Sequence, residues 1–144
     1  MAPRSRAQLE DALRRRNCAD DLAAAVLDRM TEVGLVDDPA YAVMLVRSRQ
    51  ATRGLAKLAI AHELRAKGID DEVVQEAVGS ITEESERGRA EQLAVKRLRS
   101  LQGLDPQIQA RRLSGMLARK GYSSGIVYAV VRDAIAAAPE HQRD

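Results

Sequence analysis

The residue types that most often carry catalysis are scarce in this 144-residue chain. Its two histidines are His62 and His141, and its single cysteine is Cys18. His62 precedes Glu63, but a zinc-protease helix needs a second histidine four residues after the first, and none is present. His62 is interpreted as a helix-surface residue and His141 as part of a polar tail. Cys18 is interpreted as a small apolar side chain, with a reactive thiol as the alternative.

The sequence gives equally little indication of a phosphate-binding loop or of a catalytic or metal-binding carboxylate site. No segment has the form GxxxxGK[ST], and no βαβ pattern surrounds any glycine. The acidic pairs Asp37-Asp38 and Asp70-Asp71 could hold a metal or act in acid–base chemistry, but each precedes a predicted helix, where carboxylates act as caps. The sequence therefore predicts a protein that is not an enzyme and holds no cofactor or metal.

Basic residues are the more informative group. Six cations against the single acid Glu63 concentrate positive charge between residues 47 and 67, in a chain of net charge +2. These cations are Arg47, Arg49, Arg53, Lys57, Arg65 and Lys67. A smaller basic group follows at Lys96, Arg97, Arg99, Arg111, Arg112, Arg119 and Lys120. Such groups can bind nucleic-acid phosphates or an acidic protein surface, or form a solvated face.

The composition favours helices and limits the kinds of nucleic-acid contact. The apolar share of 45% contains three Tyr and no Phe or Trp, which does not favour strands or a platform that stacks bases. Any nucleic-acid contact is therefore expected at the backbone. No apolar stretch is long enough to span a membrane, no apolar signal region is present, and one cysteine allows no intramolecular disulfide. We expect a cytoplasmic, monomeric, all-α protein.

One sequence pattern occurs three times. It consists of Leu, two mostly basic or small residues, a cation, Asn or Gly, and an apolar residue, at 13–18, 64–69 and 117–122. The copies are 51 and 53 residues apart. Each copy predicts the end of a helix and a tight turn, because a terminal cation suits the helix dipole and Asn or Gly accepts left-handed backbone. The final apolar residue of each copy is expected to tuck under the turn.

Each turn is followed by a predicted helix with one buried face. Asp20, Asp70 and either Ser123 or Ser124 are the expected N-caps of these helices. The expected buried faces are Leu22, Val26, Leu27 and Met30 in the first helix, Val73, Val74, Ala77, Val78 and Ile81 in the second, and Ile126, Val127, Val130, Val131 and Ile135 in the third.

Five further helices are predicted around these turns. Three precede the turns, from Ser5 or Arg6 to Arg16, from Gly54 to Lys67 and from Asp105 to Lys120. Two lie between the helix pairs, one from Asp38 with a stripe that reaches Ser48, and one from Glu83 or Glu84 to Gln102. Asp38 is the expected cap of the 38–48 helix, with Pro39 in its first position, and Pro106 suits the first position of another.

Three helices therefore make one repeat. Repeat 1 covers residues 1–36, repeat 2 covers 37–81, and repeat 3 covers 82–144 including a short polar tail. Repeat 1 has two helices, because the chain begins near where its first helix should lie. We expect that helix to be absent or lost by N-terminal shortening. Three-helix units bury little alone, so we expect tandem repeats stacked into an elongated, curved helical solenoid.

Several spaced segments in the middle of the chain occur in an order found in one known family. They are Gly34-Leu35-Val36-Asp37-Asp38-Pro39-Ala40-Tyr41-Ala42, Val46-Arg47-Ser48-Arg49, Arg53-Gly54 and Glu63-Leu64-Arg65-Ala66-Lys67-Gly68-Ile69. Together they resemble the central signature of the bacterial RecX regulatory proteins. Residues 117–122 are similar to that family's final repeat and residues 4–9 to its opening segment, whereas Asn17-Cys18 departs from its usual pattern. The signature positions expected to be structural are Asp37, Asp38, Tyr41, Gly54, Leu64, Gly68, Ile69, Leu117, Gly121 and Tyr122.

The resemblance implies a function and a partner. It implies three tandem three-helix repeats without enzymatic activity, which bind the RecA recombinase and restrain it. Family members are held to enter or cap the RecA–DNA filament and to lower its ATPase, strand-exchange and coprotease activities. The family has no invariant ligand residue to transfer, so the expected contact surface rests on charge, with Arg47, Arg49, Arg53 and Lys57 foremost. The alternative is a helical protein that binds the DNA backbone without sequence preference.

Overall fold

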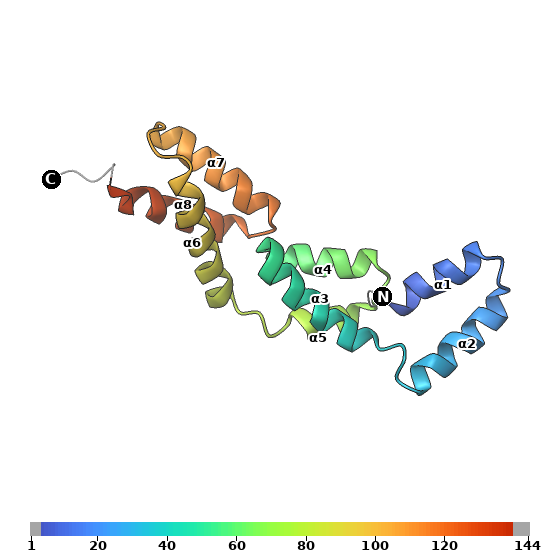
Figure 1. Ribbon diagram of the computed structural model, residues 1–144. Helices are drawn as coiled ribbons and strands as arrows, with labels where there is room; N and C mark the ends of the chain where they lie inside the picture. The colour runs from blue at the N-terminus through green and yellow to red at the C-terminus, as the bar shows by residue number, and fades with distance from the viewer. Residues whose placement is uncertain (1–3, 140–144) are drawn as a thin grey trace. The chain divides into compact units, whose positions relative to one another are not determined.

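The protein is all-α, as predicted. The computed structural model describes residues 4–139, and this range contains helices and no β-strand (Figure 1). The helices are α1 (Arg6–Arg15), α2 (Asp20–Glu32), α3 (Asp38–Arg53), α4 (Lys57–Ala66), α5 (Asp71–Val78), α6 (Glu83–Arg99), α7 (Pro106–Arg119) and α8 (Ser124–Ala137). His141 and the rest of the polar tail lie outside the described residues.

The three predicted turns have the same geometry. The left-handed residue that ends α1, α4 and α7 is Asn17, Gly68 and Gly121, with φ of 61°, 79° and 94°. In each turn the next backbone N–H donates to the carbonyl five residues earlier, from Cys18 to Leu13 at 3.0 Å, Ile69 to Leu64 at 3.2 Å and Tyr122 to Leu117 at 3.2 Å. These are Schellman motifs, so the predicted turn is confirmed at all three copies.

Two of these turns also require glycine for space. A Cβ on Gly68 would lie 2.4 Å from Cβ of Ala7 in α1, and a Cβ on Gly121 would lie 2.7 Å from Cβ of Ala59 in α4. The turn after α4 thus packs directly on α1, and the turn after α7 packs on α4. Ile69 and Tyr122 are buried beneath their turns as expected, whereas Cys18 is only half-buried.

The predicted cap of α3 is wrong by one residue. The helix begins at Asp38, and Oδ1 of Asp37 accepts the N–H of Ala40 at 3.0 Å, so Asp37 is the cap. Pro39 therefore stands in the second helical position. The carboxylate of Asp38 is used elsewhere, because its Oδ1 accepts the backbone N–H of Arg6 at 2.9 Å.

The other predicted caps divide into two kinds. Ser123 accepts the N–H of Ile126 at 3.3 Å, and Pro106 occupies the first position of α7, both as predicted. Asp20 is wrong as a cap, because it is the first residue of α2 and Ala19 holds the cap position. Asp70 holds the cap position of α5 but makes no capping hydrogen bond with its side chain. These two carboxylates can still favour the positive end of the helix dipole.

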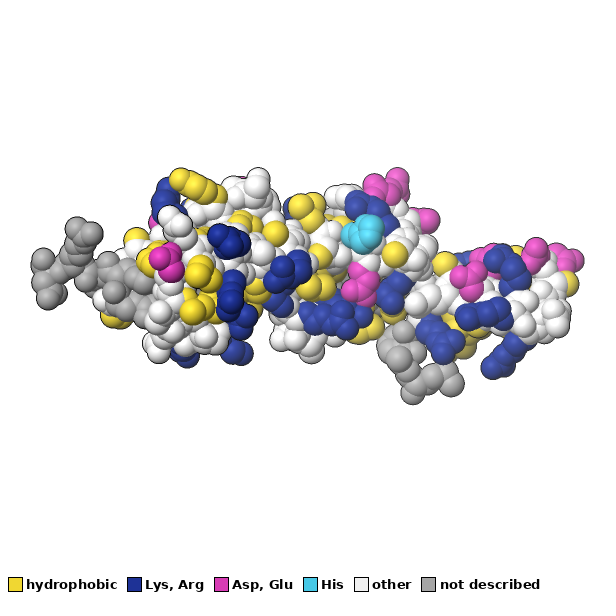
Figure 2. All heavy atoms as spheres, turned by 90° about the horizontal axis from the view of Figure 1, so that it is seen from above, with side chains coloured by type: hydrophobic (Ala, Val, Ile, Leu, Met, Phe, Trp, Pro, Cys, Tyr) yellow, Lys and Arg dark blue, Asp and Glu magenta, His cyan; other side chains and the backbone are white. Residues whose placement is uncertain are grey.

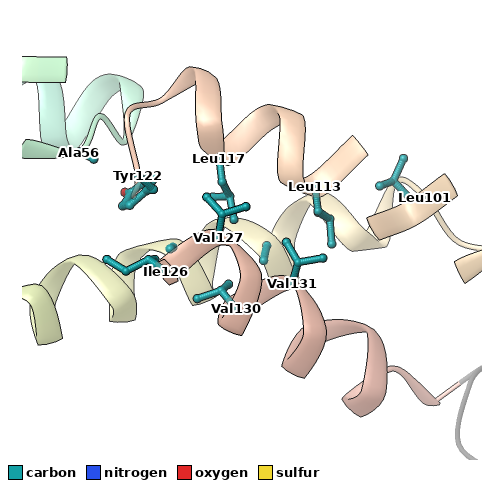
Figure 3. Close-up of a cluster of buried hydrophobic side chains, with 11 residues drawn as sticks. Ala56, Leu101, Leu113, Leu117, Tyr122, Ile126, Val127, Val130 and Val131 are labelled. Carbon is teal, nitrogen blue, oxygen red and sulfur yellow. The ribbon is translucent and has the colours of Figure 1, made fainter. Parts of the chain in front are cut away.

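The chain forms two compact units. Unit 1 combines the chain up to Arg49 with Ile60–Ser80, and unit 2 combines Gln50–Ala59 with the chain from Ile81. The core of unit 2 lies where α6, α7 and α8 meet, and Figure 3 shows its aliphatic side chains interleaved around Leu117 and Val127. The predicted repeat limits at residues 36 and 81 stay predictions.

A corresponding pair of hydrogen bonds, differing in one donor, occurs once in each unit, where helices of successive repeats meet. In unit 1, Ser5 Oγ donates to the carbonyl of Lys67 at 2.8 Å, beside the Arg6–Asp38 hydrogen bond. In unit 2, the N–H of Ala56 donates to the carbonyl of Lys120 at 2.8 Å, and the N–H of Lys57 donates to Oε2 of Glu86 at 2.7 Å. Each bond pair joins the start of one repeat's second helix to the next repeat, and we call this arrangement the repeat joint.

One predicted buried face is wrong in part. Leu27 is buried in α2, but Leu22 and Val26 are exposed. In unit 2 the long helix α6 packs along α8 and helps to bury the corresponding residues, whereas the main neighbour of α2 is α1 (Figure 1). The apolar periodicity of the sequence correctly identifies an apolar face on α2. Such a face is buried only where another helix covers it.

Candidate partner-binding surfaces

Arg49, one of the predicted contact residues, forms an intramolecular ion pair with Glu63. Its Nε and Nη2 donate to the two carboxylate oxygens of Glu63, at 2.8 Å and 2.7 Å, and both side chains are half-buried. This hydrogen bonding raises the pKa of the Arg49 guanidinium. Tyr41 lies buried beside the pair, and burial raises the pKa of its phenol. The pair fastens α3 to α4, a structural use that restricts Arg49 as a partner contact.

Two more of the predicted cations also have internal partners. Nζ of Lys67 lies 3.8 Å from Oε2 of Glu63, and Nε of Arg65 lies 2.9 Å from Oδ1 of Asp71. The Arg65 pair connects the end of α4 with the start of α5. The exposed Arg65 pair contributes little to stability, and both pairs reduce the charge available to a partner.

Arg47 and Arg53 remain as exposed cations of the predicted set. Neither forms an ion pair with the described residues of the chain, and Arg47 belongs to unit 1 while Arg53 belongs to unit 2. Lys57 is half-buried, and its backbone N–H is part of the repeat joint. The predicted set is therefore divided between internal pairs and free surface.

Charge is distributed unequally between the two units. Unit 1 has 10 Lys and Arg against 13 Asp and Glu, whereas unit 2 has 13 Lys and Arg against 8 Asp and Glu. On the face seen in Figure 2, dark blue basic side chains are frequent over unit 2 and magenta carboxylates are few. The positive charge of the protein is thus concentrated in unit 2.

Six exposed cations of unit 2 lie on two helices, and we call them the α6–α7 basic residues. They are Lys96, Arg97 and Arg99 in α6 and Arg111, Arg112 and Arg119 in α7. None of them forms an ion pair with a described carboxylate, and α7 contains no acidic residue. The density of basic residues along the sequence favours the 47–67 cluster over this group. The fold reverses that order, because Glu63 and Asp71 pair with cations of the 47–67 cluster.

The backbone of α7 at Gly115 is in contact with the side chain of Arg119. The atoms nearest to a Cβ at Gly115 would be those of the Arg119 guanidinium, with Nη1 at 3.0 Å. The Arg119 side chain therefore lies across the helix backbone at this glycine. Arg111 and Arg112 lie one turn earlier on the exposed side of α7. This face presents guanidinium groups to solvent.

The apolar signature positions are buried, namely Tyr41, Leu64, Ile69, Leu117 and Tyr122. Leu64 and Leu117 are fully buried, and the hydroxyl of Tyr122 donates to the carbonyl of Gly54 at 2.9 Å. Burial, with the charge of Glu86, raises the pKa of the Tyr122 phenol. These residues hold helices together and present no reactive group to solvent.

No metal-binding cluster of His, Cys, Asp or Glu side chains is present within residues 4–139. His62 is exposed on α4, and Sγ of the half-buried Cys18 donates to the carbonyl of Ala19 at 3.8 Å. No group of three or more His, Cys, Asp or Glu side chains in this range could hold a metal ion. None of the described helices has both the length and the apolar character needed to cross a bilayer.

An apolar groove of about 380 Å³ lies in unit 2 between α6 and α8. Val95, Leu98, Ala134 and Ala137 form its walls, and Arg99 is the charged residue of its lining. The lining offers packing and a single charge, without a pair of groups that could exchange a proton.

Three family models match the chain in order. They describe the first, second and third three-helix domains of RecX, and they match residues 1–30, 37–78 and 84–131. The regulatory protein RecX of Thermobifida fusca is 49% identical over 136 residues, which cover 94% of this chain and 74% of that protein. The regulatory protein RecX of Streptomyces coelicolor is 47% identical over 133 residues, which cover 92% of this chain and 71% of that protein.

Solved structures agree with the fold. The crystal structure of RecX from Lactobacillus salivarius superposes with a TM-score of 0.81 at 23% identity, covering 92% of this chain and 86% of that one. A crystal structure of a regulatory protein RecX gives a TM-score of 0.78 at 26% identity, covering 92% of this chain and 64% of that one.

The helices, turns and repeat joints define an all-α protein of three tandem three-helix domains. The chain belongs to the RecX family of regulatory proteins.

Proposed function

We propose that this protein is a negative regulator of the RecA recombinase. It binds the RecA–DNA filament and lowers its ATPase, strand-exchange and coprotease activities, without catalysing a reaction itself. In this role it acts in the cytoplasm, in DNA repair, recombination and the SOS response. The observation that carries the proposal is the match of all three RecX domains in order along the chain.

The exposed cations supply the contact surface in this proposal. Arg47 and Arg53 of the predicted set are unpaired and exposed, and the α6–α7 basic residues add a larger group in unit 2. Arginine forms paired hydrogen bonds with carboxylates and phosphates, so this surface suits acidic RecA side chains and DNA phosphates alike. Arg49, Arg65 and Lys67 contribute less, because Glu63 and Asp71 already engage them.

A second candidate function is binding to the DNA backbone without RecA. The excess of 13 basic over 8 acidic residues in unit 2 favours it. Binding of this kind weakens steeply with salt and shows no sequence preference.

Co-sedimentation distinguishes the two functions. The protein is mixed with RecA filaments on single-stranded DNA, with RecA alone and with DNA alone, at low and physiological salt. The proposal predicts strongest co-sedimentation with the filament, retained at physiological salt. Equal binding to bare DNA and to the filament, abolished by salt, would establish the DNA-backbone function instead.

A further inference from the structure

The second and third three-helix domains can be compared position by position. Counterparts in α4 and α7 are 53 residues apart, at Leu64 and Leu117, Gly68 and Gly121, and Glu63 and Met116. Counterparts in α3 and α6 are 48 residues apart, at Asp38 and Glu86, Ala42 and Ala90, and Arg49 and Arg97. The first two pairs of each set agree in burial, in left-handed backbone or in their place in the repeat joint. The register of the third pair follows from them.

One ion pair of the second domain has no counterpart in the third. Arg49 donates to both carboxylate oxygens of Glu63, at 2.8 Å and 2.7 Å, and is half-buried. In the third domain Met116 stands at the position of Glu63, and Arg97 forms no ion pair with a described carboxylate. Arg97 is exposed, and its Nη1 donates to the hydroxyl of Ser100 at 3.1 Å. The third domain therefore keeps the guanidinium of this pair without its acid.

The residues beside Met116 on α7 add positive charge at the same place. Arg112 and Arg119 lie four residues before and three residues after Met116, on the same side of the helix. Their counterparts in α4 are Ala59 and Ala66. Both arginines are exposed, and neither forms an ion pair with a described carboxylate. With the two ion-pair positions included, these four positions carry no net charge in the second domain and +3 in the third.

We propose that Arg97 binds a carboxylate of an acidic segment on the partner protein, in the way that Arg49 binds Glu63. The acidic side chain takes the place that Met116 leaves without a charge, and the neighbouring arginines on α7 attract further acidic residues. A guanidinium and a carboxylate can form two parallel hydrogen bonds, and the second domain already holds a carboxylate in this geometry. The inference rests on the proposed function, in which that partner is the RecA filament, and it assigns this contact to protein rather than to DNA.

Supplying the carboxylate from within the chain tests the inference. M116E places on α7 the acid that α4 has, so it should pair with Arg97 and exclude the partner's carboxylate. The concentration for half-inhibition of RecA ATPase on single-stranded DNA should then rise by about tenfold. The matched control A118E adds the same charge to α7 at an exposed position two residues away, which faces another side of the helix. It should leave inhibition near the wild-type value.

Stability measurements separate occupation of the site from damage to the fold. M116E should unfold at a higher urea concentration than M116Q, because only the charged side chain can form an ion pair with Arg97. A midpoint for M116E no higher than that of M116Q would show that Arg97 holds no carboxylate here, and would overturn the inference. R97A should weaken inhibition as M116E does, and M116E should add no further loss in the R97A background.

The remaining outcomes distinguish this inference from the proposed function. A wild-type protein that does not inhibit RecA contradicts the proposed function, and this inference with it. Wild-type inhibition that M116E leaves intact, or that A118E lowers as strongly, overturns this inference alone. Co-sedimentation with bare single-stranded DNA is the last measurement. If M116E weakens that binding as much as binding to the filament, Arg97 contacts DNA phosphates, and the contact with protein is overturned.

Discussion

The backbone N–H of Lys57 donates to Oε2 of Glu86 at 2.7 Å, and the backbone N–H of Arg6 donates to Oδ1 of Asp38 at 2.9 Å. Both bonds join the first turn of a repeat's second helix to an acidic side chain in the first turn of the next repeat's first helix. The repeat joint thus recurs with a different acidic residue each time. Joining these helix starts through a carboxylate also satisfies backbone donors that lack an intrahelical partner.

Substitution of Glu86 should destabilise unit 2. Glu86 is buried and accepts a charge-assisted hydrogen bond, so E86A should lower the free energy of unfolding by about 1.5–3 kcal/mol. E86Q keeps an acceptor oxygen and should cost less. The measurement is urea denaturation followed by circular dichroism. E84A, an exposed change in the same helical turn, is the control, and an equal loss in E84A and E86A would contradict the role of the joint.

Replacement of the turn glycines should separate backbone strain from crowding. Gly34 and Gly68 have φ of 78° and 79°, but only a Cβ at Gly68 meets another atom within 4 Å, namely Ala7 Cβ at 2.4 Å. G34A should cost about 1–2 kcal/mol through left-handed strain, and G68A about 1–3 kcal/mol more through overpacking. Denaturant midpoints of the two variants provide the comparison. Similar losses would mean that α1 does not pack tightly on this turn.

Stability should decrease at alkaline pH partly through Tyr122. Burial raises the pKa of its phenol above the ordinary value of 10.0, so the folded chain keeps this proton where the unfolded chain releases it. The stabilisation is complete below pH 10.0 and is lost as the pH rises towards the folded pKa. Unfolding free energies measured on both sides of that value should fall less steeply in Y122F. An identical slope in Y122F would contradict this. Tyr41, whose pKa is also raised by burial, contributes to the slope that remains.

Removal of arginines from α7 should weaken RecA inhibition more than removal of the same charge elsewhere. Exposed ion pairs contribute about 0.2–1 kcal/mol each, so R111A/R112A/R119A should raise the concentration for half-inhibition by about tenfold. R14A/R15A/R16A removes three arginines from the end of α1 and the residue that follows it, and serves as the charge-matched control. The assay is RecA ATPase on single-stranded DNA, with circular dichroism as a check on folding. Equal effects of the two triple variants would exclude α7 as the contact.

The turns could be predicted because their information is local. Leu117-Ala118-Arg119-Lys120-Gly121-Tyr122 contains the terminal cation, the left-handed glycine and the apolar residue that make one Schellman motif. The three copies support one another, since Asn17 alone would have been a weak signal. The helical class, the turns and most buried faces were therefore accessible from the chain.

Interactions between distant residues could not be predicted in the same way. Nothing local indicates that Glu63 engages Arg49 or that Asp38 serves Arg6 while Asp37 caps the helix. The exposure of Leu22 likewise depends on a neighbouring helix and not on its own periodicity. Charge density along the sequence indicates the 47–67 cations as the contact surface. In the folded chain some of these cations pair with carboxylates of the same chain.

The central claim, that this chain restrains RecA, is tested most directly by titrating the wild-type protein into the ATPase reaction of the cognate RecA on single-stranded DNA. The account predicts a progressive fall in ATP hydrolysis, and the ratio at half-inhibition reports the mode of action. Inhibition far below one protein per RecA subunit indicates capping of the filament end, and a near-equal ratio indicates occupation of its groove. An unchanged rate at a molar excess of folded protein would contradict the claim.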